Sequence, residues 1–232
     1  MLKAAGPNFW LADGPVVQFF GVFPYPTRMA AARLEDGSLW VWSPIALDDA
    51  LAAELDAIGP VRELVAPNKL HHLALPEWVA RYPEARLHGA PGLARKRRDL
   101  AFHTELGDTP DPAWVDQIDQ VVFRGSVILD EVLFFHRRSR TALVTDLIQR
   151  FEPDTLPAWC RPIMRWDGLV GPAGAAPRDF RATVWNRRAA RACRATALAW
   201  QPARLVIAHG TLPEEDGTEA LRRGFRWLGP ER

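Results

Sequence analysis

Several apolar segments of the sequence end in side chains that can bind metal ions. "VRELVAPNKLHHL" runs into His71 and His72, "TALVTD" ends at Asp146, and "ARLVIAH" ends at His209. Imidazole nitrogen and carboxylate oxygen are ligands for zinc, iron and manganese, and such ions activate a bound water near neutral pH. These residue types predict a divalent-metal site, with zinc as the first choice and iron or manganese as alternatives.

Two further polar residues follow strands of the same kind. Ser43 ends "SLWVWS", and Asn68 precedes the two histidines. In α/β sheets, ligands bind beyond the carboxyl ends of the strands, where loops present side chains without disturbing the core. One polar residue at such a position is more often structural, but several converging strand ends favour a shared site. We therefore predict that Ser43 and Asn68 contribute to substrate binding.

The elements that must position these residues alternate between strands and helices. Short apolar or alternating runs predict strands, and longer runs with apolar residues three or four apart predict helices. The predicted strands are residues 16–23, two strands within 27–45 joined by a turn at "EDGS", and residues 61–67, 85–90, 120–125, 131–137, 141–148 and 203–209. The predicted helices are residues 47–60, 75–83, 182–200 and 217–229, with a short helix and loop over 92–112.

Residues 151–182 break this alternation. Their prolines and glycines argue against regular elements, although "LPAWCRPIMRW" is compatible with a partial helix. We predict one domain over residues 1–232. Residues 151–182 are then an irregular insertion within it, either a packing element or a lid.

The composition indicates an ordinary globular protein. Of 232 residues, 48% are apolar and 25% charged, and the formal net charge is +1, so nothing demands nucleic acid or an anionic membrane. Cys160 and Cys193 lack the spacing of a zinc cluster. No segment has the pattern of a signal peptide or the length to span a bilayer. We expect a cytoplasmic protein with a small-molecule substrate or ligand and no nucleic-acid or membrane partner.

Two arginines are candidates for holding an anionic substrate. Arg28 in "PYPTRM" and Arg140 in "RRSRT" each carry a planar guanidinium, which binds carboxylate or phosphate through two parallel hydrogen bonds. A salt bridge to one of the chain's own carboxylates explains each of them equally well. His88 and His103 have no recognisable partners, and we expect both at the surface.

The order of these elements resembles a known superfamily. A β-meander, a helix, a strand with a histidine-bearing loop, a hairpin strand ending in Asp and a strand ending in His are similar to the metallo-β-lactamase fold. More closely, "YPTRM", "LEDGSLWVWSPI", "LVAPNKLHHL", "DQVVFRG", "DEVLFFHRRSRTALVTDL" and "VIAHG" resemble an uncharacterised group within it, DUF4336. The resemblance covers nearly the whole chain and implies an α/β protein with four αββα layers.

The resemblance also implies roles for single residues. Asp146 falls at the superfamily's bridging aspartate, His209 at its last histidine, and the "PNKLHHL" loop at its first metal motif. Ser43 stands where an aspartate is usual, and Asp130 and Glu131 replace a histidine expected before "EVLFFH". The implied ligand set is therefore a modified one: His71, His72, Glu131, Asp146 and His209.

Such a site predicts a metal-dependent, hydrolase-like enzyme whose substrate and further catalytic residues the sequence does not identify. A metal-bound hydroxide would be the nucleophile and a spare carboxylate the base. Two alternatives stay open. The scaffold could bind a small molecule or a protein without chemistry, or it could perform another function, such as nucleic-acid processing.

Overall fold

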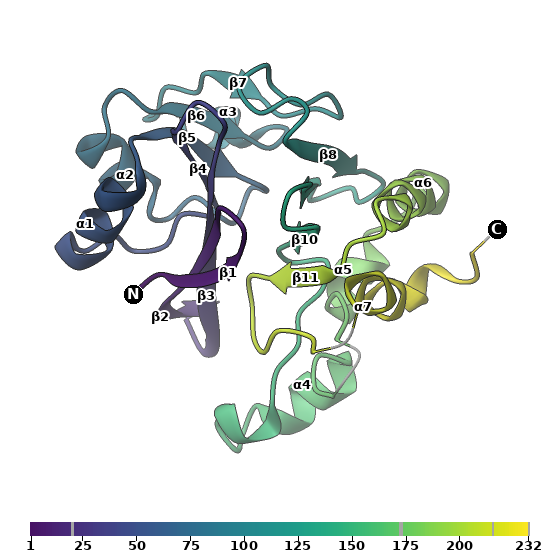
Figure 1. Cartoon of the computed structure of the whole chain (residues 1–232). Helices are drawn as coiled ribbons and strands as arrows, with labels where there is room; N and C mark the ends of the chain where they lie inside the picture. Colours follow the sequence, from purple (N-terminus) through teal and green to yellow (C-terminus); the bar gives the residue numbers. More distant parts are fainter. Residues whose placement is uncertain (20, 172–173, 215, 232) are drawn as a thin grey trace.

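Two β-sheets face each other in this chain, whose structure is a computed structural model that describes residues 1–19, 21–171, 174–214 and 216–231 (Figure 1). The first sheet comprises β1 (Lys3–Gly6), β2 (Phe9–Phe19), β3 (Phe23–Arg33), β4 (Leu39–Trp42), β5 (Val61–Ala66), β6 (Arg86–Gly89) and β7 (Thr104–Glu105). The second comprises β8 (Ile118–Phe123), β9 (Glu131–His136), β10 (Thr141–Val144) and β11 (Arg204–Ile207).

Strand direction changes within both sheets. The first sheet runs in chain order, antiparallel from β1 to β4 and parallel from β4 to β7. The order in the second sheet is β11-β10-β9-β8, with β8, β9 and β10 antiparallel and β10 parallel to β11. Parallel neighbours end on the same side of a sheet, so residues that follow β4 and β5, or β10 and β11, come close together.

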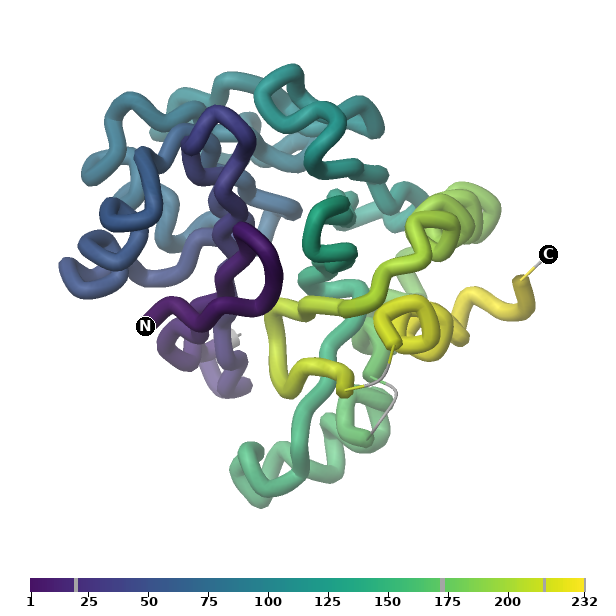
Figure 2. The backbone as a smooth tube through the Cα atoms, viewed as in Figure 1, coloured from purple at the N-terminus to yellow at the C-terminus, as the bar shows by residue number. Residues whose placement is uncertain are grey.

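Helices lie on the outer faces of both sheets and beside the β2–β3 hairpin. They are α1 (Asp49–Ile58), α2 (Leu75–Arg81), α3 (Leu93–Lys96), α4 (Arg161–Asp167), α5 (Arg178–Ala182), α6 (Arg187–Ala199) and α7 (Gly217–Gly224), with 3₁₀ turns η1 (Pro153–Thr155) and η2 (Arg226–Leu228). α1 and α2 pack on the first sheet, and α6 and α7 on the second (Figure 1). The predicted four-layer αββα fold is confirmed. The N-terminus lies beside the first sheet and the C-terminal segment lies beyond α7 (Figure 2). Within the described parts of the chain, no helix is long and apolar enough to cross a membrane.

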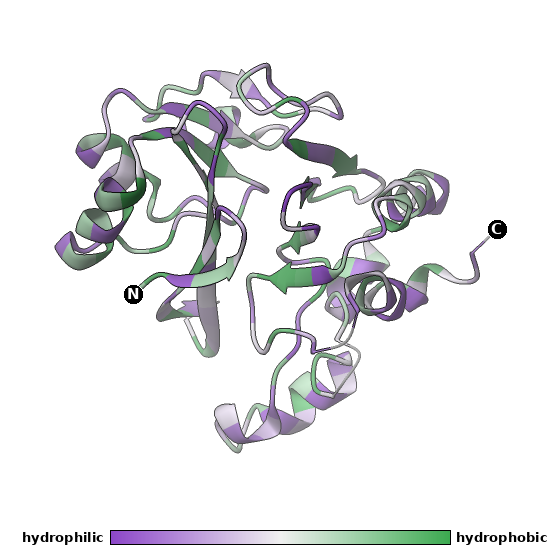
Figure 3. Ribbon diagram, viewed as in Figure 1, coloured by the Kyte–Doolittle hydropathy of each residue, from purple (hydrophilic) through white to green (hydrophobic). Residues whose placement is uncertain are grey.

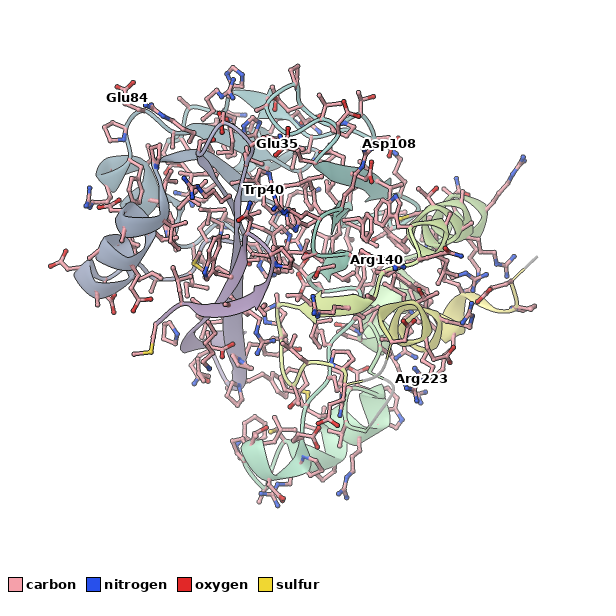
Figure 4. The ribbon with its side chains drawn as sticks, in the orientation of Figure 1. Glu35, Trp40, Glu84, Asp108, Arg140 and Arg223 are labelled. Carbon is pink, nitrogen blue, oxygen red and sulfur yellow. The ribbon has the colours of Figure 1, made fainter. Side chains whose placement is uncertain are left out.

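Alternation along the strands creates separate apolar layers. In β4, Trp40 and Trp42 face the second sheet, whereas Leu39 and Val41 belong to the layer under α1 and α2. Phe134 of β9 meets Trp40 edge-on, with ring centroids 5.2 Å apart. Figure 4 shows Trp40 between the two halves of the molecule, and Figure 3 shows hydrophobic strands beside helices of mixed polarity. These rings therefore join the two sheets.

The helix predicted over residues 47–60 is confirmed as α1. The Asp48 carboxylate accepts the N–H of Leu51 at 2.7 Å and so caps the first turn. Leu51 and Leu55 lie buried on the sheet side, as their spacing predicts. Gly59 follows the last helical residue, where a Cβ would collide with the carbonyl oxygen of Gly37.

The prediction of one strand over residues 16–23 is wrong. The chain reverses at Gly21, whose φ of 73° suits glycine, so the segment ends β2 and begins β3. In the sequence, the apolar residues on both sides of this tight hairpin form one continuous run, which is why they predict a single strand. β1 and the first half of β2 were also absent from the sequence prediction.

Residues 151–182 are more regular than predicted. They contain η1, α4 and α5. Within this segment, Phe151, Leu156, Cys160, Met164 and Leu169 form an apolar cluster with Tyr25 of β3. The segment is thus anchored on the β2–β3 hairpin, and its role as a lid stays a prediction.

His88 is buried, and the expectation of a surface position was wrong. Its ring contacts Glu63 Oε2 at 2.6 Å and Thr104 Oγ1 at 2.7 Å, and Arg86 pairs with the other oxygen of Glu63. These partners lie on β5, β6 and β7, which only sheet pairing brings together. His103 is exposed, as expected.

His136 gives the fold a pH dependence. Its Nδ1 lies 2.8 Å from Ser139 Oγ, and its ring stacks on Phe9. Burial, and then the charge of Arg138, lower the pKa of His136 from 6.5 to about 4. Because the unfolded state binds the proton more readily, this group leaves stability intact above pH 6.5 and lowers it progressively as the pH falls towards 4.

Between pH 7 and pH 5, we predict that the free energy of unfolding falls by about 2 kcal/mol less in His136→Gln than in the wild type. Urea unfolding of chelator-treated protein at both pH values measures this difference, and His103→Gln is the exposed control. Identical pH dependence in wild type and His136→Gln would contradict the assignment.

Candidate metal centre

Three of the predicted ligands meet at one end of the sandwich. Nε2 of His71 lies 3.3 Å from Oδ2 of Asp146, and Nε2 of His209 lies 3.3 Å from Oδ1 of the same carboxylate. The two Nε2 atoms are 3.2 Å apart. One ligand atom from each of the three residues lies within 4.8 Å of the other two, so together they could hold a metal ion.

Each of these residues follows the carboxyl end of a strand. His71 lies in the loop after β5, Asp146 comes two residues after β10, and His209 comes two residues after β11. β10 and β11 are parallel neighbours, so Asp146 and His209 leave the second sheet side by side. β5 belongs to the first sheet, so the group bridges the two sheets.

Hydrogen bonds at Nδ1 orient both imidazoles. His209 Nδ1 lies 2.8 Å from the carbonyl oxygen of Pro26, which can only accept, so Nδ1 carries a hydrogen. His71 Nδ1 lies 2.8 Å from Ser43 Oγ, whose hydroxyl donates to the Arg28 carbonyl oxygen at 3.1 Å. His71 Nδ1 is therefore also the donor. In their neutral forms, both rings direct an Nε2 lone pair towards Asp146.

Ser43 occupies a strained position to make this contact. Its φ of 52° is left-handed, which is uncommon for residues other than glycine. It directly follows β4, and its N–H donates to the Val65 carbonyl oxygen at 2.9 Å. Backbone strain of this kind is concentrated at functional sites. The strained turn places the hydroxyl beneath His71.

Asn68 connects the histidine loop to the carboxylate. Its Oδ1 accepts the N–H groups of Leu70 at 2.7 Å and His71 at 3.2 Å, which shapes the loop. Its Nδ2 faces Asp146 Oδ2 at 2.7 Å, with Thr145 Oγ1 at 2.9 Å. Asn68 therefore positions two of the three ligands at once.

Gln149 and Glu131 complete the support of Asp146. Gln149 Nε2 donates to Asp146 Oδ1 at 3.1 Å. Glu131 accepts the backbone N–H of Thr145 at 2.7 Å and that of Asp146 at 2.8 Å. Burial first, and then the charge of Asp146, raise the pKa of Glu131 to about 7. The loop after β10 is thus held by side chains on both sides.

Burial and neighbouring groups shift the pKa values of the three residues in different directions. Burial lowers the pKa of His209, but the hydrogen bond to Asp146, the charges of Asp146 and Glu131 and the contact with the Pro26 carbonyl together outweigh burial and raise it. Burial dominates at His71 and lowers its pKa. Burial also disfavours the Asp146 charge, but the hydrogen bonds to His209 and His71 hold the pKa of Asp146 well below its usual range. Of the two imidazoles beside the Asp146 carboxylate, His209 therefore binds a proton more readily than His71 in the metal-free protein.

The donor set fits a zinc ion. Bonds of about 2.0–2.1 Å in a tetrahedral zinc site imply ligand atoms about 3.4 Å apart. The two Nε2 atoms are 3.2 Å apart, and each lies 3.3 Å from a different oxygen of Asp146, Oδ2 for His71 and Oδ1 for His209. Two histidines and one carboxylate leave a fourth position open, as catalytic zinc sites do, and the same set also suits iron(II).

His72 and Glu131, predicted as further ligands, do not join the group. His72 Nδ1 accepts from Arg97 Nη1 at 2.9 Å. Burial, followed by the charges of Lys96 and Arg97, lowers the pKa of His72 to about 4. Glu131 is fully buried and directs its oxygens to backbone N–H groups and Asn68. The structure therefore brings together three of the five predicted ligands.

A cavity of about 680 Å³ opens above the three ligands. Tyr25, Ile45, Leu129 and Phe180 contribute to its largely apolar wall, and Ser43 lies at its base. The lining also includes His71, Asp146 and His209. A pocket of this size and character suits a small molecule with one reactive polar group.

The other predicted substrate-binding residues do not line this cavity, although Asn68 contacts Asp146 beneath it. Asn68, Arg28 and Arg140 are absent from the described lining of this cavity. Arg28 pairs with Asp13 and donates to the carbonyl oxygens of Ile207 and Gly210, tying β3 to the His209 loop. Arg140 sits in the β9–β10 turn, at the opposite end of β10 from Asp146.

The supporting contacts from Gln149 and the Pro26 carbonyl were missed from the sequence. Gln149 lies three residues after Asp146, one residue beyond the strand predicted over 141–148. A backbone carbonyl has no sequence signal at all. Only the spacing of Gln149 from Asp146, one helical turn away, could have indicated such a contact.

Residues 16–165 match a known family, the "Domain of unknown function (DUF4336)". This chain belongs to the DUF4336 family. The match spans more than half of the chain and includes His71 and Asp146, whereas His209 lies beyond it. The resemblance drawn from the sequence is confirmed. Among curated proteins, none matches the sequence.

Solved structures share the fold of this DUF4336 protein at low identity. A metallo-β-lactamase from Pontibacter korlensis has a TM-score of 0.64 and 12% identity, with 98% of both chains covered. The metallo-β-lactamase FIM-1 from Pseudomonas aeruginosa, in its mono-zinc form, gives 0.65 and 11%, covering 98% of this chain and 94% of that one. Rubredoxin oxygen:oxidoreductase from Desulfovibrio gigas gives 0.65 and 10%, covering 98% and 61%. Such identities establish a common fold and leave the activity open.

We predict that Asn68→Ala lowers both stability and metal affinity. Its loss leaves buried carboxylates with fewer donors, at a cost of about 2–4 kcal/mol in the free energy of unfolding. Zinc affinity should fall about 10–100-fold because the ligands lose their orientation. Chemical denaturation and competitive zinc titration measure the two effects.

Asn186→Ala is the matched control. Asn186 caps α6 by accepting the N–H of Ala189 at 3.1 Å. Its loss should cost about 1 kcal/mol of stability and leave zinc affinity unchanged. Unchanged zinc affinity in Asn68→Ala would refute the positioning role.

Proposed function

We propose that this protein is a metal-dependent hydrolase with one divalent ion, zinc as the first choice, held by His71, Asp146 and His209. The observation that carries the proposal is the convergence of two Nε2 atoms and a carboxylate within 3.2–3.3 Å of one another. Both Nδ1 atoms have their own acceptors, so the Nε2 lone pairs are available. Metal-binding histidines are typically oriented in this way.

The chemistry follows from the open fourth position and the apolar cavity. A zinc ion bound here would act as a Lewis acid and activate water near neutral pH. Hydrolysis adds the oxygen of one water to the substrate's acyl carbon, and the leaving alcohol or amine takes a proton, so no other co-reactant is needed. Asp146 can ligate through one oxygen and take up the proton through the other. The apolar wall limits competing solvent.

A single ion is favoured over a dinuclear centre. His72 is bound to Arg97, and Glu131 is committed to backbone N–H groups, so neither is free to hold a second ion. The FIM-1 metallo-β-lactamase, which shares the fold, was solved in a mono-zinc form. That precedent supports a one-metal site on this scaffold.

The substrate in this proposal is a small molecule, not a nucleic acid or a membrane. The cavity has a largely apolar lining, and the formal net charge of the chain is only +1. A cytoplasmic location remains the expectation drawn from the sequence. The competing function is a binding module that uses the same cavity without chemistry.

We predict about one zinc per chain in protein purified without an affinity tag. Elemental analysis should show the metal lost in His71→Ala, Asp146→Ala and His209→Ala but retained in His72→Ala, the adjacent control. Hydrolysis of a panel of esters, thioesters, lactones and amides should follow the metal content.

Each outcome decides between the two functions. A folded protein that takes up no zinc, iron or manganese even after reconstitution would sink the enzyme proposal. A protein that retains metal but hydrolyses none of the panel, while binding members of it tightly, would support the binding module instead.

A further inference from the structure

The cavity above the metal centre carries an unusual concentration of lysine. Only Lys3, Lys69 and Lys96 occur in the chain, where arginine otherwise supplies the positive charge, and two of the three line this cavity. Lys69 lies two residues before His71 in the same loop, and Lys96 ends α3. The two lysines therefore form a positively charged corner beside the metal ligands.

These ammonium groups have few partners of their own. Lys96 Nζ donates to the Lys69 carbonyl oxygen at 2.7 Å, which brings the two residues together. Neither ammonium makes an ion pair with any carboxylate in the described chain. Neighbouring Arg97, by contrast, is paired with Asp99. An ammonium has three donors, so most of this corner's donors are open to solvent or to a ligand.

Like charge accumulates around Lys96. Burial first, and then the charges of Lys69 and Arg97, lower its pKa. Lys69 also acts on Asp130, but burial outweighs that effect and the pKa of Asp130 is raised. An anion bound at this corner would relieve the repulsion among these positive charges.

Two carboxylates of the cavity outside the metal centre already accept hydrogen bonds from the protein. Glu77 accepts the backbone N–H of Leu47 at 2.9 Å, and Asp179 accepts that of Phe180 at 2.6 Å. Both carboxylates thus have donors within the protein. A ligand with a positive group gains less from them than an anionic ligand gains from the two lysines.

The rest of the cavity suits an apolar chain. Leu70, Leu73 and Ile128 line it while remaining 39%, 69% and 59% exposed, so they form an apolar rim. Large exposed apolar side chains gathered around a cavity indicate a binding surface. An occupant would cover both this rim and the apolar wall.

We propose that the substrate is an anionic amphiphile, whose carboxylate or phosphate binds Lys69 and Lys96 while its apolar chain fills the cavity. This inference rests on the proposed hydrolase function for its reaction but concerns binding alone. The anionic group is separate from the bond that is cleaved, because the proposed hydrolysis takes place at His71, Asp146 and His209, and the lysines are not part of that group. The carboxylate and phosphate forms share the same recognition chemistry.

Binding can be tested with four probes of equal chain length: decanoate, decyl phosphate, decanol and decyltrimethylammonium. Calorimetric titration of metal-free, chelator-treated full-length protein keeps the metal from acting as the anion's partner. We expect decanoate or decyl phosphate to bind at least about tenfold more tightly than decanol, and the stronger of the two identifies the anionic group.

Variants assign the preference to the lysines. Lys69→Gln and Lys96→Gln should each weaken anion binding about tenfold without changing decanol binding. Lys96→Arg keeps the charge and should retain binding, and Lys3→Gln is the control outside the cavity. Circular dichroism melting checks that each variant is folded.

Two results would overturn the proposal. One is equal affinity for all four probes, or a preference for decyltrimethylammonium. The other is unchanged binding of the stronger anion, decanoate or decyl phosphate, in folded Lys69→Gln and Lys96→Gln. The hydrolase proposal is tested separately, by the metal content of the protein. A protein that binds zinc but shows no preference for anions would refute this inference and leave the hydrolase proposal standing.

Discussion

The repulsion among three buried acceptor groups is the constraint on which the site depends. Two Nε2 atoms and the Asp146 carboxylate lie 3.2–3.3 Å apart with little water to separate them. Such an arrangement needs a positive charge at its centre. A proton can supply that charge in the metal-free state, and His209 takes it up more readily than His71. In the proposed metal site a divalent ion would replace that proton.

The two sheets are joined through this group as much as through their apolar faces. The Pro26 carbonyl and Ser43 come from the first sheet and orient the imidazoles, while Glu131 from the second sheet holds the Asp146 loop. Asn68 crosses from one sheet to the other. Proteins with this fold include a metallo-β-lactamase and an oxidoreductase, so side chains around the group, and not the fold, must decide the activity.

The sequence predicted what is local or repeated along the chain. Strand ends, the apolar stripe of α1 and the candidate ligands Asp146 and His209 follow from patterns that a reader can see in order. The sequence could not predict that Arg97 donates a hydrogen bond to His72, or that Glu131 accepts hydrogen bonds from backbone N–H groups. Those roles depend on which neighbours the sheets supply. Residue type alone made both side chains look like ligands.

The most direct test of the central claim is a crystal structure of zinc-loaded protein with anomalous diffraction collected at the zinc edge. The account predicts one peak within bonding distance of Nε2 of His71, Nε2 of His209 and the carboxylate of Asp146. No peak there, a peak bound by His72, or a second ion held by Glu131 would contradict it.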